Sequence, residues 1–264
     1  MTISDCGVIV SGTIDSKSRK RRSCSRLCTK VLVMSLLRSH FSGPQAIFSD
    51  ESHPLFRVIR GQVEEFPYRS TNLGVEVSLS DTTSSLFNST FAAFINPKPR
   101  QWIIFIEPYG VALRKIDHLF PRELEGPYAP PRVDFLWARV HDDPRSGPRD
   151  LAAPGFWAVR GEHGEMVLDR LKAAWEAEPG ATEADETRIW SQVVRDLLLR
   201  KRAFERGEVL CPPVGSIDWK ALCSAAFVTV PHWPEPERWK FLQSLYFGTY
   251  FADETGMLVN LFDP

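Results

Sequence analysis

The hydrophobic pattern of the chain changes its period near residue 161, and this change limits the folds open to it. Before this point, short segments alternate apolar and polar residues or run continuously apolar, as β-strands do. After it, apolar residues recur every three or four positions, as in amphipathic helices. Strands that precede the helices favour an α+β fold over an alternating βαβ sheet. We therefore predict a mixed or antiparallel sheet from the first half, packed by helices from the second half.

The strand-like segments lie mostly between residues 54 and 161. The clearest is the apolar run WIIFI at 102–106, which is followed by Glu107 and Pro108 and is typical of a strand buried on both faces. This run is far too short to cross a bilayer, so we expect no contact with a membrane. The sequence predicts strands at 54–61, 62–69, 73–80, 101–108, 132–141, 155–161 and 257–262.

The second half of the chain predicts four helices. The most regular one covers 182–207, where Ile189, Val193 and Leu197 share one apolar face. Its expected last turns, 200–206, are rich in Arg and Lys, which the negative end of a helix dipole favours. The other predicted helices cover 164–180, 216–227 and 235–256.

Charge separates the first 45 residues from the rest. They contain eight Lys and Arg against two Asp, a net charge of +6, and the remaining chain carries a net charge of −7. A composition rich in Ser and Arg buries too little apolar surface to fold. We therefore predict a basic, disordered arm over 1–45, with a true start at Met34 as one alternative. A single α+β domain is expected over 46–264, β-rich at 50–160 and helical at 161–256.

The same numbers limit the partners. An acidic body repels phosphate, so we expect nucleic acid to bind only through the basic arm, if at all. Five cysteines are scattered along the chain without a CxxC pair, which indicates reduced thiols in a cytoplasmic protein. A protein partner, with no membrane involved, fits this composition best.

The segment VHDDP at 140–144 holds the one candidate site. His141, Asp142 and Asp143 come at the end of a predicted strand, and histidine with carboxylates suits a divalent metal ion. Glu107 ends another strand and would join them if the two strands were parallel neighbours. The simpler interpretation, which we favour, is an ordinary polar turn before Pro144.

No familiar catalytic motif supports an enzyme. The chain has no GxSxG, P-loop, GxGxxG or HExxH. We therefore predict a soluble intracellular binding or inhibitory protein, without a cofactor. It would act on a protein partner through its acidic, aromatic-rich body, in which all eight Trp follow residue 100. The alternative is a metal-assisted hydrolase with Glu107, His141 and Asp142 as catalytic residues, and a divalent metal held by His141, Asp142 and Asp143.

Overall fold

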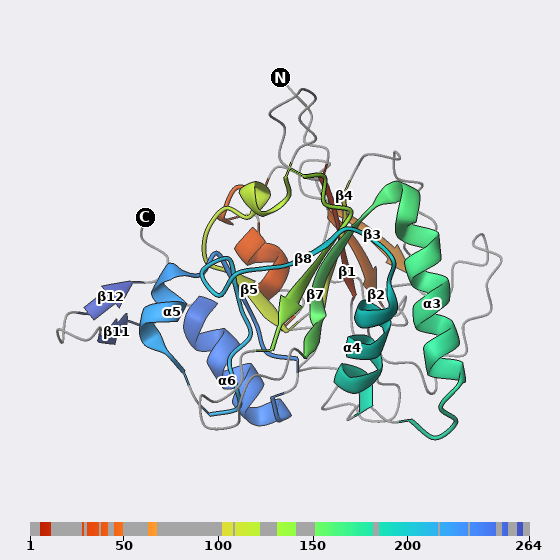
Figure 1. Ribbon diagram of the computed structural model, residues 1–264. Helices are drawn as coiled ribbons and strands as arrows, with labels where there is room; N and C mark the ends of the chain where they lie inside the picture. Colours follow the sequence, from red (N-terminus) through yellow and green to blue (C-terminus); the bar gives the residue numbers. More distant parts are fainter. Residues whose placement is uncertain are drawn as a thin grey trace.

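A computed structural model gives the fold of the chain (Figure 1). It describes residues 6–11, 28, 31–36, 38–41, 45–49, 63–67, 102–107, 109–121, 131–140, 151–181, 185–215, 217–231, 233–246, 250–252 and 258–260. The strands are β1 (Cys6–Ser11), β2 (Gln45–Ser49), β3 (Val63–Pro67), β4 (Trp102–Ile106), β5 (Gly110–Ala112), β6 (Phe135–Arg139), β7 (Ala152–Arg160), β8 (Lys201–Ala203), β9 (Val209–Leu210), β10 (Phe227–Thr229), β11 (Tyr250–Ala252) and β12 (Leu258–Asn260). The helices are α3 (Gly164–Glu176), α4 (Glu186–Asp196), α5 (Trp219–Ser224) and α6 (Glu235–Tyr246), with 3-10 turns η3 (Asp117–Leu119) and η4 (Gly161–His163).

The described residues form a main sheet in the order β3-β2-β1-β4-β7-β6-β8. The first four strands of this order are mutually parallel. Strand β7 runs antiparallel to both β4 and β6, and β8 runs parallel to β6. All strands of the sheet except β7 therefore point in one direction. The sheet is mixed and helices pack against it, which confirms the α+β prediction.

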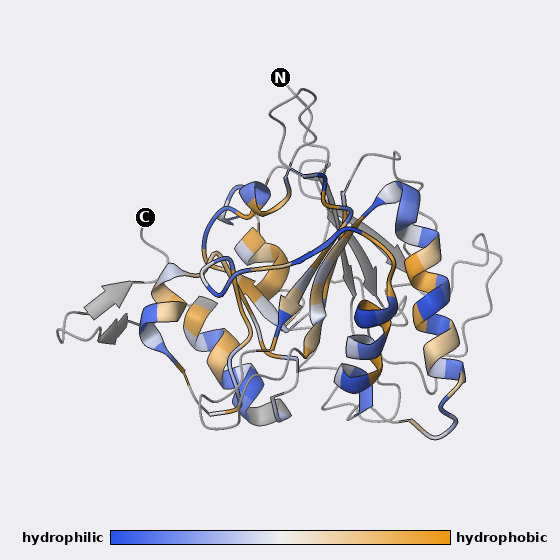
Figure 2. Cartoon of the chain, in the orientation of Figure 1, coloured by the Kyte–Doolittle hydropathy of each residue, from blue (hydrophilic) through white to orange (hydrophobic). Residues whose placement is uncertain are grey.

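Two helical layers cover the main sheet. Ile103 and Phe105 of β4 face α3 and α4 in one core cluster, whose centre includes Trp157 and Trp190. Ile104 and Ile106 point the other way, into a second cluster with helical residues 31–36. This alternation is the two-residue period of a strand. The prediction that the run 102–106 is buried on both faces is confirmed. Figure 2 shows the apolar sides of α3 and α4 turned toward the strands.

A smaller sheet continues from the carboxyl end of β4. Its order is β5-β10-β9, with β10 antiparallel to β5 and parallel to β9. Val111 and Val228 pack in a third cluster with residues of α5 and α6. On the other side, Phe227 packs in the cluster that also contains helical residues 31–36. The small sheet thus ties the last third of the chain to the end of β4.

The structure differs from our expectation for residues 1–45. It places β1 between β2 and β4, in the middle of the main sheet. Leu32, Val33 and Leu36, which lie in the same part of the chain, are fully buried. Strand β1 is six residues long and has only three consecutive apolar residues, 8–10, too few to stand out from their surroundings. Its strand partners are 35 or more residues away along the chain, where a local pattern carries no signal.

Several other predictions can be compared with the structure. Strands within 62–69, 101–108, 132–141 and 257–262 are confirmed, and the strand predicted at 155–161 begins earlier, at Ala152. Helices within 164–180 and 216–227 are confirmed, although the second ends at Ser224. The helix predicted over 235–256 ends at Tyr246, and residues 250–252 form β11 instead. The predicted strands at 54–61 and 73–80 lie outside the described residues. The helix predicted over 182–207 ends at Asp196 instead, and residues 201–203 form β8. Across the described ranges, the structure shows no helix with the length and apolarity needed to span a bilayer.

Candidate active site

The strand order creates a switch point at the carboxyl ends of β1 and β4. From β1 the chain builds outward through β2 to β3, and then it adds β4 on the opposite side of β1. In open sheets of this kind, a crevice lies outside the carboxyl ends of the strands at which the order reverses. Open parallel sheets bind their ligands in this crevice. Val10 of β1 and Ile106 of β4 pair at this edge. Glu107 follows Ile106 directly, so it marks the position of the candidate site.

Glu107 is a buried carboxylate at the switch point. Only 2% of its surface is exposed, and its backbone N–H donates to the carbonyl oxygen of Gly155 (3.0 Å). Burial raises the pKa of the nearby Cys211 thiol, and the negative charge of Glu107 raises it further. Cys211 therefore stays protonated near neutral pH and cannot act as a thiolate nucleophile. Burying a carboxylate is costly, so buried acids at a strand edge are candidates for function.

Strand β7 bulges next to Glu107. Trp137 of β6 pairs with Trp157, but the next residue, Ala138, pairs with Ala153, so residues 154–156 of β7 have no direct partner on β6. Bulges occur often beside active sites because they redirect the backbone. This bulge carries Gly155 toward the small sheet. A Cβ atom at Gly155 would lie 2.8 Å from the hydroxyl oxygen of Thr229.

The hydroxyl group of Thr229 is held at the same place. Thr229 is the last residue of β10 and is fully buried. Among the described residues, its Oγ1 has no hydrogen-bond partner. A buried hydroxyl without a partner costs about 1–3 kcal/mol. The edge beside Glu107 therefore retains an unsatisfied polar group that a ligand or a water molecule would stabilise.

Tyr109 and Arg238 complete the cluster. The carbonyl oxygen of Tyr109, two residues after Glu107, accepts a hydrogen bond from the N–H of Val230 (2.8 Å). The guanidinium carbon of Arg238 in α6 lies 3.5 Å from the centroid of the Tyr109 ring. One of its N–H groups, on Nη1, donates to the carbonyl oxygen of Pro231 (2.7 Å). Arg238 is only 6% exposed, so a cation is buried beside the switch point.

The structure describes only one of the candidate residues that we named from the sequence. Glu107 lies at the carboxyl end of β4, as predicted. Strands β4 and β6 are parallel in direction, but β7 lies between them, so the condition that they are neighbours is not met. The ends of β4 and β6 are therefore two strand spacings apart, about 10 Å. His141, Asp142 and Asp143 lie outside the described residues, and the metal site there stays a prediction.

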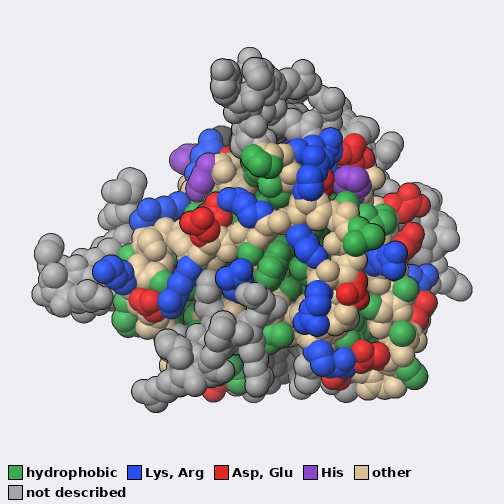
Figure 3. All heavy atoms as spheres, viewed as in Figure 1, with side chains coloured by type: hydrophobic (Ala, Val, Ile, Leu, Met, Phe, Trp, Pro, Cys, Tyr) green, Lys and Arg blue, Asp and Glu red, His purple; other side chains and the backbone are tan. Residues whose placement is uncertain are grey.

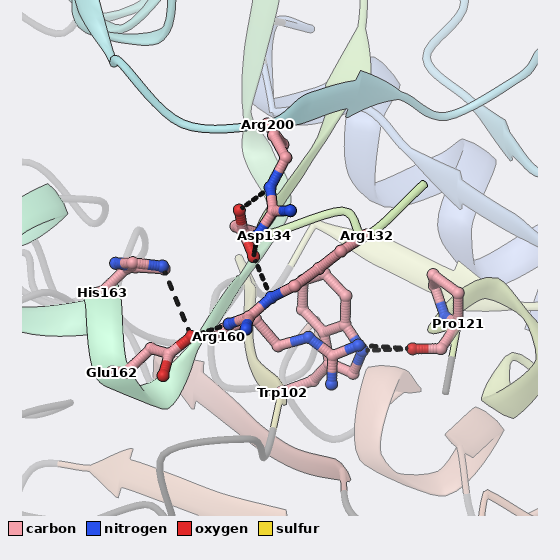
Figure 4. A network of polar contacts seen from close by, with 8 residues as sticks. All are labelled: Trp102, Pro121, Arg132, Asp134, Arg160, Glu162, His163 and Arg200. Atoms are coloured by element: carbon pink, nitrogen blue, oxygen red, sulfur yellow. Dashed lines mark hydrogen bonds and ion pairs between the residues drawn. The ribbon is translucent and has the colours of Figure 1, made fainter. Parts of the chain in front are cut away.

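A second polar cluster, which our sequence analysis did not predict, lies at the opposite edge of the sheet. Asp134 precedes β6, while Glu162 and His163 follow β7, and their ligand atoms lie within 4.8 Å of one another (Figure 4). Asp134 and Glu162 are 28 positions apart in the sequence, so they form no local motif.

Arginine side chains already neutralise this second cluster. Arg200 Nε lies 2.8 Å from Asp134 Oδ2, and Arg132 contacts both Asp134 and Glu162. Burial would raise the pKa of Asp134, but hydrogen bonds from Arg200 and Arg132 bring it below its usual value. Two guanidinium groups would repel a divalent ion. The cluster is therefore best explained as an ion network that joins β6, η4 and the start of β8.

The basic residues at 200–206 are likewise engaged within the fold. Figure 3 shows Lys and Arg side chains spread over the viewed face, with acidic side chains among them. Arg202 pairs with Glu208 and Arg206 with Asp218. Lys201 donates to backbone carbonyl groups at the end of α4. These contacts tie Lys201, Arg202 and Arg206 to neighbouring parts of the fold.

Comparison of the sequence with protein-family models and with curated proteins gives no match. Solved structures do match the fold. The glycosyltransferase GlyE of Streptococcus pneumoniae TIGR4 superimposes with a TM-score of 0.52 at 13% identity, over 76% of this chain and 45% of that one. Its apo form gives a TM-score of 0.51 at 10% identity, over 78% and 46% of the two chains. The chain thus spans less than half the length of GlyE.

A third similar structure is a glycosyltransferase involved in the glycosylation of the major capsid of PBCV-1. It matches with a TM-score of 0.48 at 12% identity, over 90% of this chain and 98% of that one.

The fold likeness corrects our prediction of function. The solved structures of GlyE, which share the fold over about three quarters of this chain, are those of a glycosyltransferase. The prediction of a binding or inhibitory protein is therefore wrong. It rested on missing motifs, but a site at a topological switch point is assembled from the ends of strands that are distant in the sequence, so the absence of those motifs does not exclude it. The predictions of a protein partner and of a cytoplasmic location stay predictions. The chain is similar in fold to GlyE over three quarters of its length.

Proposed function

We propose that the protein is a glycosyltransferase that binds an activated sugar donor at the carboxyl ends of β1 and β4. The observation that carries this proposal is the buried carboxylate of Glu107 at the switch point of a sheet that shares its fold with GlyE. Folds of this layout bind nucleotides in that crevice. A nucleoside diphosphate sugar is therefore the donor class that suits the site.

The chemistry follows from the charges that develop during transfer. The bond between the anomeric carbon of the donor sugar and its phosphate oxygen breaks, and an acceptor hydroxyl forms the new bond. The leaving nucleoside diphosphate takes the electron pair, and the proton of the acceptor hydroxyl passes to water. Positive charge builds on the sugar ring in such transition states, and a fixed carboxylate stabilises it. Glu107 is suited to this role, and to accepting hydrogen bonds from sugar hydroxyl groups.

The test is release of nucleoside diphosphate from a panel of UDP-, GDP- and ADP-sugars, measured by chromatography with added Mn²⁺ and with EDTA. We expect the parent protein to consume at least one donor. Glu107→Gln keeps the size of the side chain but removes its charge, and we expect a rate loss of about a hundredfold.

The matched control is Glu186→Gln, because Glu186 is also a buried glutamate but lies in the first turn of α4, outside this cluster. It should keep the parental rate. A parent protein that consumes no donor, or a Glu107→Gln variant as fast as the parent, would overturn the proposal.

A further inference from the structure

Arg238 is a buried cation whose charge is balanced by no carboxylate in the described part of the chain. Its contacts there are the ring of Tyr109 and the carbonyl oxygen of Pro231. Taking a guanidinium group out of water is costly unless an anion or several hydrogen bonds compensate it. The contact with Pro231 uses one of its five N–H donors. The remaining donors and the full positive charge are therefore available to an anion.

A second buried arginine in the chain offers a comparison. Arg160 is also buried, its guanidinium carbon lies 4.0 Å from the centroid of the Trp102 ring, and its Nη2 donates to the carbonyl oxygen of Pro121 (2.6 Å). Arg160, however, lies at the opposite edge of the sheet, where its backbone N–H donates to the carbonyl oxygen of Asp134 (3.0 Å) and its side chain reaches Pro121 (Figure 4). The two arginines therefore share the same kinds of contact, an aromatic ring and a proline carbonyl oxygen, and they differ in the edge of the sheet at which they lie.

The position of Arg238 shows which anion suits it. Tyr109, on which it stacks, follows Glu107 by two residues and leads into β5. The residue between them is Pro108. Glu107 is therefore the one carboxylate in the segment 107–109 that leaves β4. A donor diphosphate at this edge brings two or more negative charges that Glu107 would repel. Arg238 is the described cation that lies beside this segment, and a planar guanidinium binds phosphate oxygens in a bidentate manner.

We propose that Arg238, positioned by the ring of Tyr109, binds the diphosphate group of the donor and supplies charge compensation from the protein itself. This rests on the proposed function for the location of the donor. The ring restricts the guanidinium to one orientation, which lowers the entropy lost when the anion binds. The same cation would stabilise the diphosphate as it leaves with the electron pair of the broken bond.

The test measures binding, not turnover. Inorganic pyrophosphate is titrated into the full chain in EDTA by isothermal calorimetry, with UDP and uridine as separate probes. We expect the parent to bind pyrophosphate and UDP without a divalent ion. Arg238→Gln should weaken both by at least about tenfold, the scale of a lost charge-assisted hydrogen bond, and leave uridine unchanged. Arg160→Gln is the matched control and should bind like the parent.

Each outcome bears on the inference. Parent protein that binds pyrophosphate only with Mn²⁺, or an Arg238→Gln variant that binds as tightly as the parent, would overturn it. If Arg238→Gln does not fold, Arg238→Lys keeps the charge without the planar geometry, and weakened pyrophosphate binding is expected. Binding through Arg238 without turnover of any donor would leave this inference standing and refute the proposed function. Donor turnover by the parent, together with unchanged pyrophosphate binding by Arg238→Gln, would refute this inference and leave the proposed function standing.

Discussion

Gly155 shows how a single residue sets the distance between the two sheets. A Cβ atom there would lie 2.8 Å from Thr229 Oγ1 and 2.9 Å from Pro231 Cγ. Both are closer than side-chain atoms normally approach, and both belong to the segment that holds Arg238 in place. The absence of a side chain at this position therefore permits the contact between the β7 bulge and the end of β10.

We predict that Gly155→Ala lowers the free energy of unfolding by about 1–3 kcal/mol, since the added methyl group overpacks this contact. Donor turnover should also fall, because Thr229 and Pro231 would move relative to Glu107. Chemical denaturation measures the first effect. Gly207→Ala is the control, since nothing lies within 4 Å of a Cβ atom there, and it should change stability by less than about 0.5 kcal/mol. Equal stabilities for the two variants would show that the contact at Gly155 is loose.

At the scale of elements, α4 shows why its end was predicted too late. The apolar face continues past Asp196, and the basic residues that follow are typical of a helix end. In the structure, Leu197 leaves the helix with extended backbone angles, and Lys201 folds back onto α4. Its Nζ lies 2.7 Å from the carbonyl oxygens of both Val194 and Arg195 and 3.2 Å from that of Leu197. Lys201 thus caps the helix from the neighbouring strand β8.

We predict that Lys201→Met lowers the free energy of unfolding by about 0.5–1 kcal/mol, because the carbonyl groups at the end of α4 lose their donor. Methionine keeps most of the apolar stem, so packing should change little. Lys172→Met on α3 is the control. The ion pair of Lys172 with Glu176 is long, at 3.9 Å, so this change should leave the free energy of unfolding almost unaltered. If the urea melts of Lys201→Met and Lys172→Met coincide, water satisfies the carbonyl groups at the end of α4 as well as Lys201 does, and the cap does not stabilise the protein.

For the whole molecule, β1 decides whether the main sheet is continuous. It pairs with β2 on one side and β4 on the other, so it joins the β2–β3 pair to the rest of the sheet. Residues 31–36 pack in the same cluster as Ile104 and Ile106. The amino-terminal residues are therefore part of the fold that forms the switch point.

Removal of residues 1–33 should therefore abolish cooperative unfolding, because the strand between β2 and β4 and part of the buried helical segment would be lost. Thermal melts followed by circular dichroism at two wavelengths would measure this. A shorter deletion of residues 1–5 stops before β1 and should melt like the parent. A single sharp transition after the longer deletion would mean that the rest of the sheet folds cooperatively without β1.

The sequence alone was sufficient to identify most elements whose pattern is local. The strand at 102–106 was recognisable because five consecutive apolar residues bounded by a charged residue and proline need burial on both faces. The helix that starts at residue 164 was recognisable from its repeating apolar face. Glu107 could be named as a candidate because it ends a buried strand. These features depend on neighbours within a few residues, which a single sequence records directly.

The tertiary structure alone decided where the candidate site lies and what it contains. Glu107, Gly155, Thr229 and Arg238 come from four distant parts of the chain, and no pattern in the sequence relates them. The pairing of β4 with β7 brings the first two together, and the small sheet carries the other two to the same edge. The position of β1, which creates the switch point, depends on pairing with strands far along the chain. Contacts of this kind are selected by the packing of the whole core, which is why local reasoning placed β1 in a disordered arm and left the site incomplete.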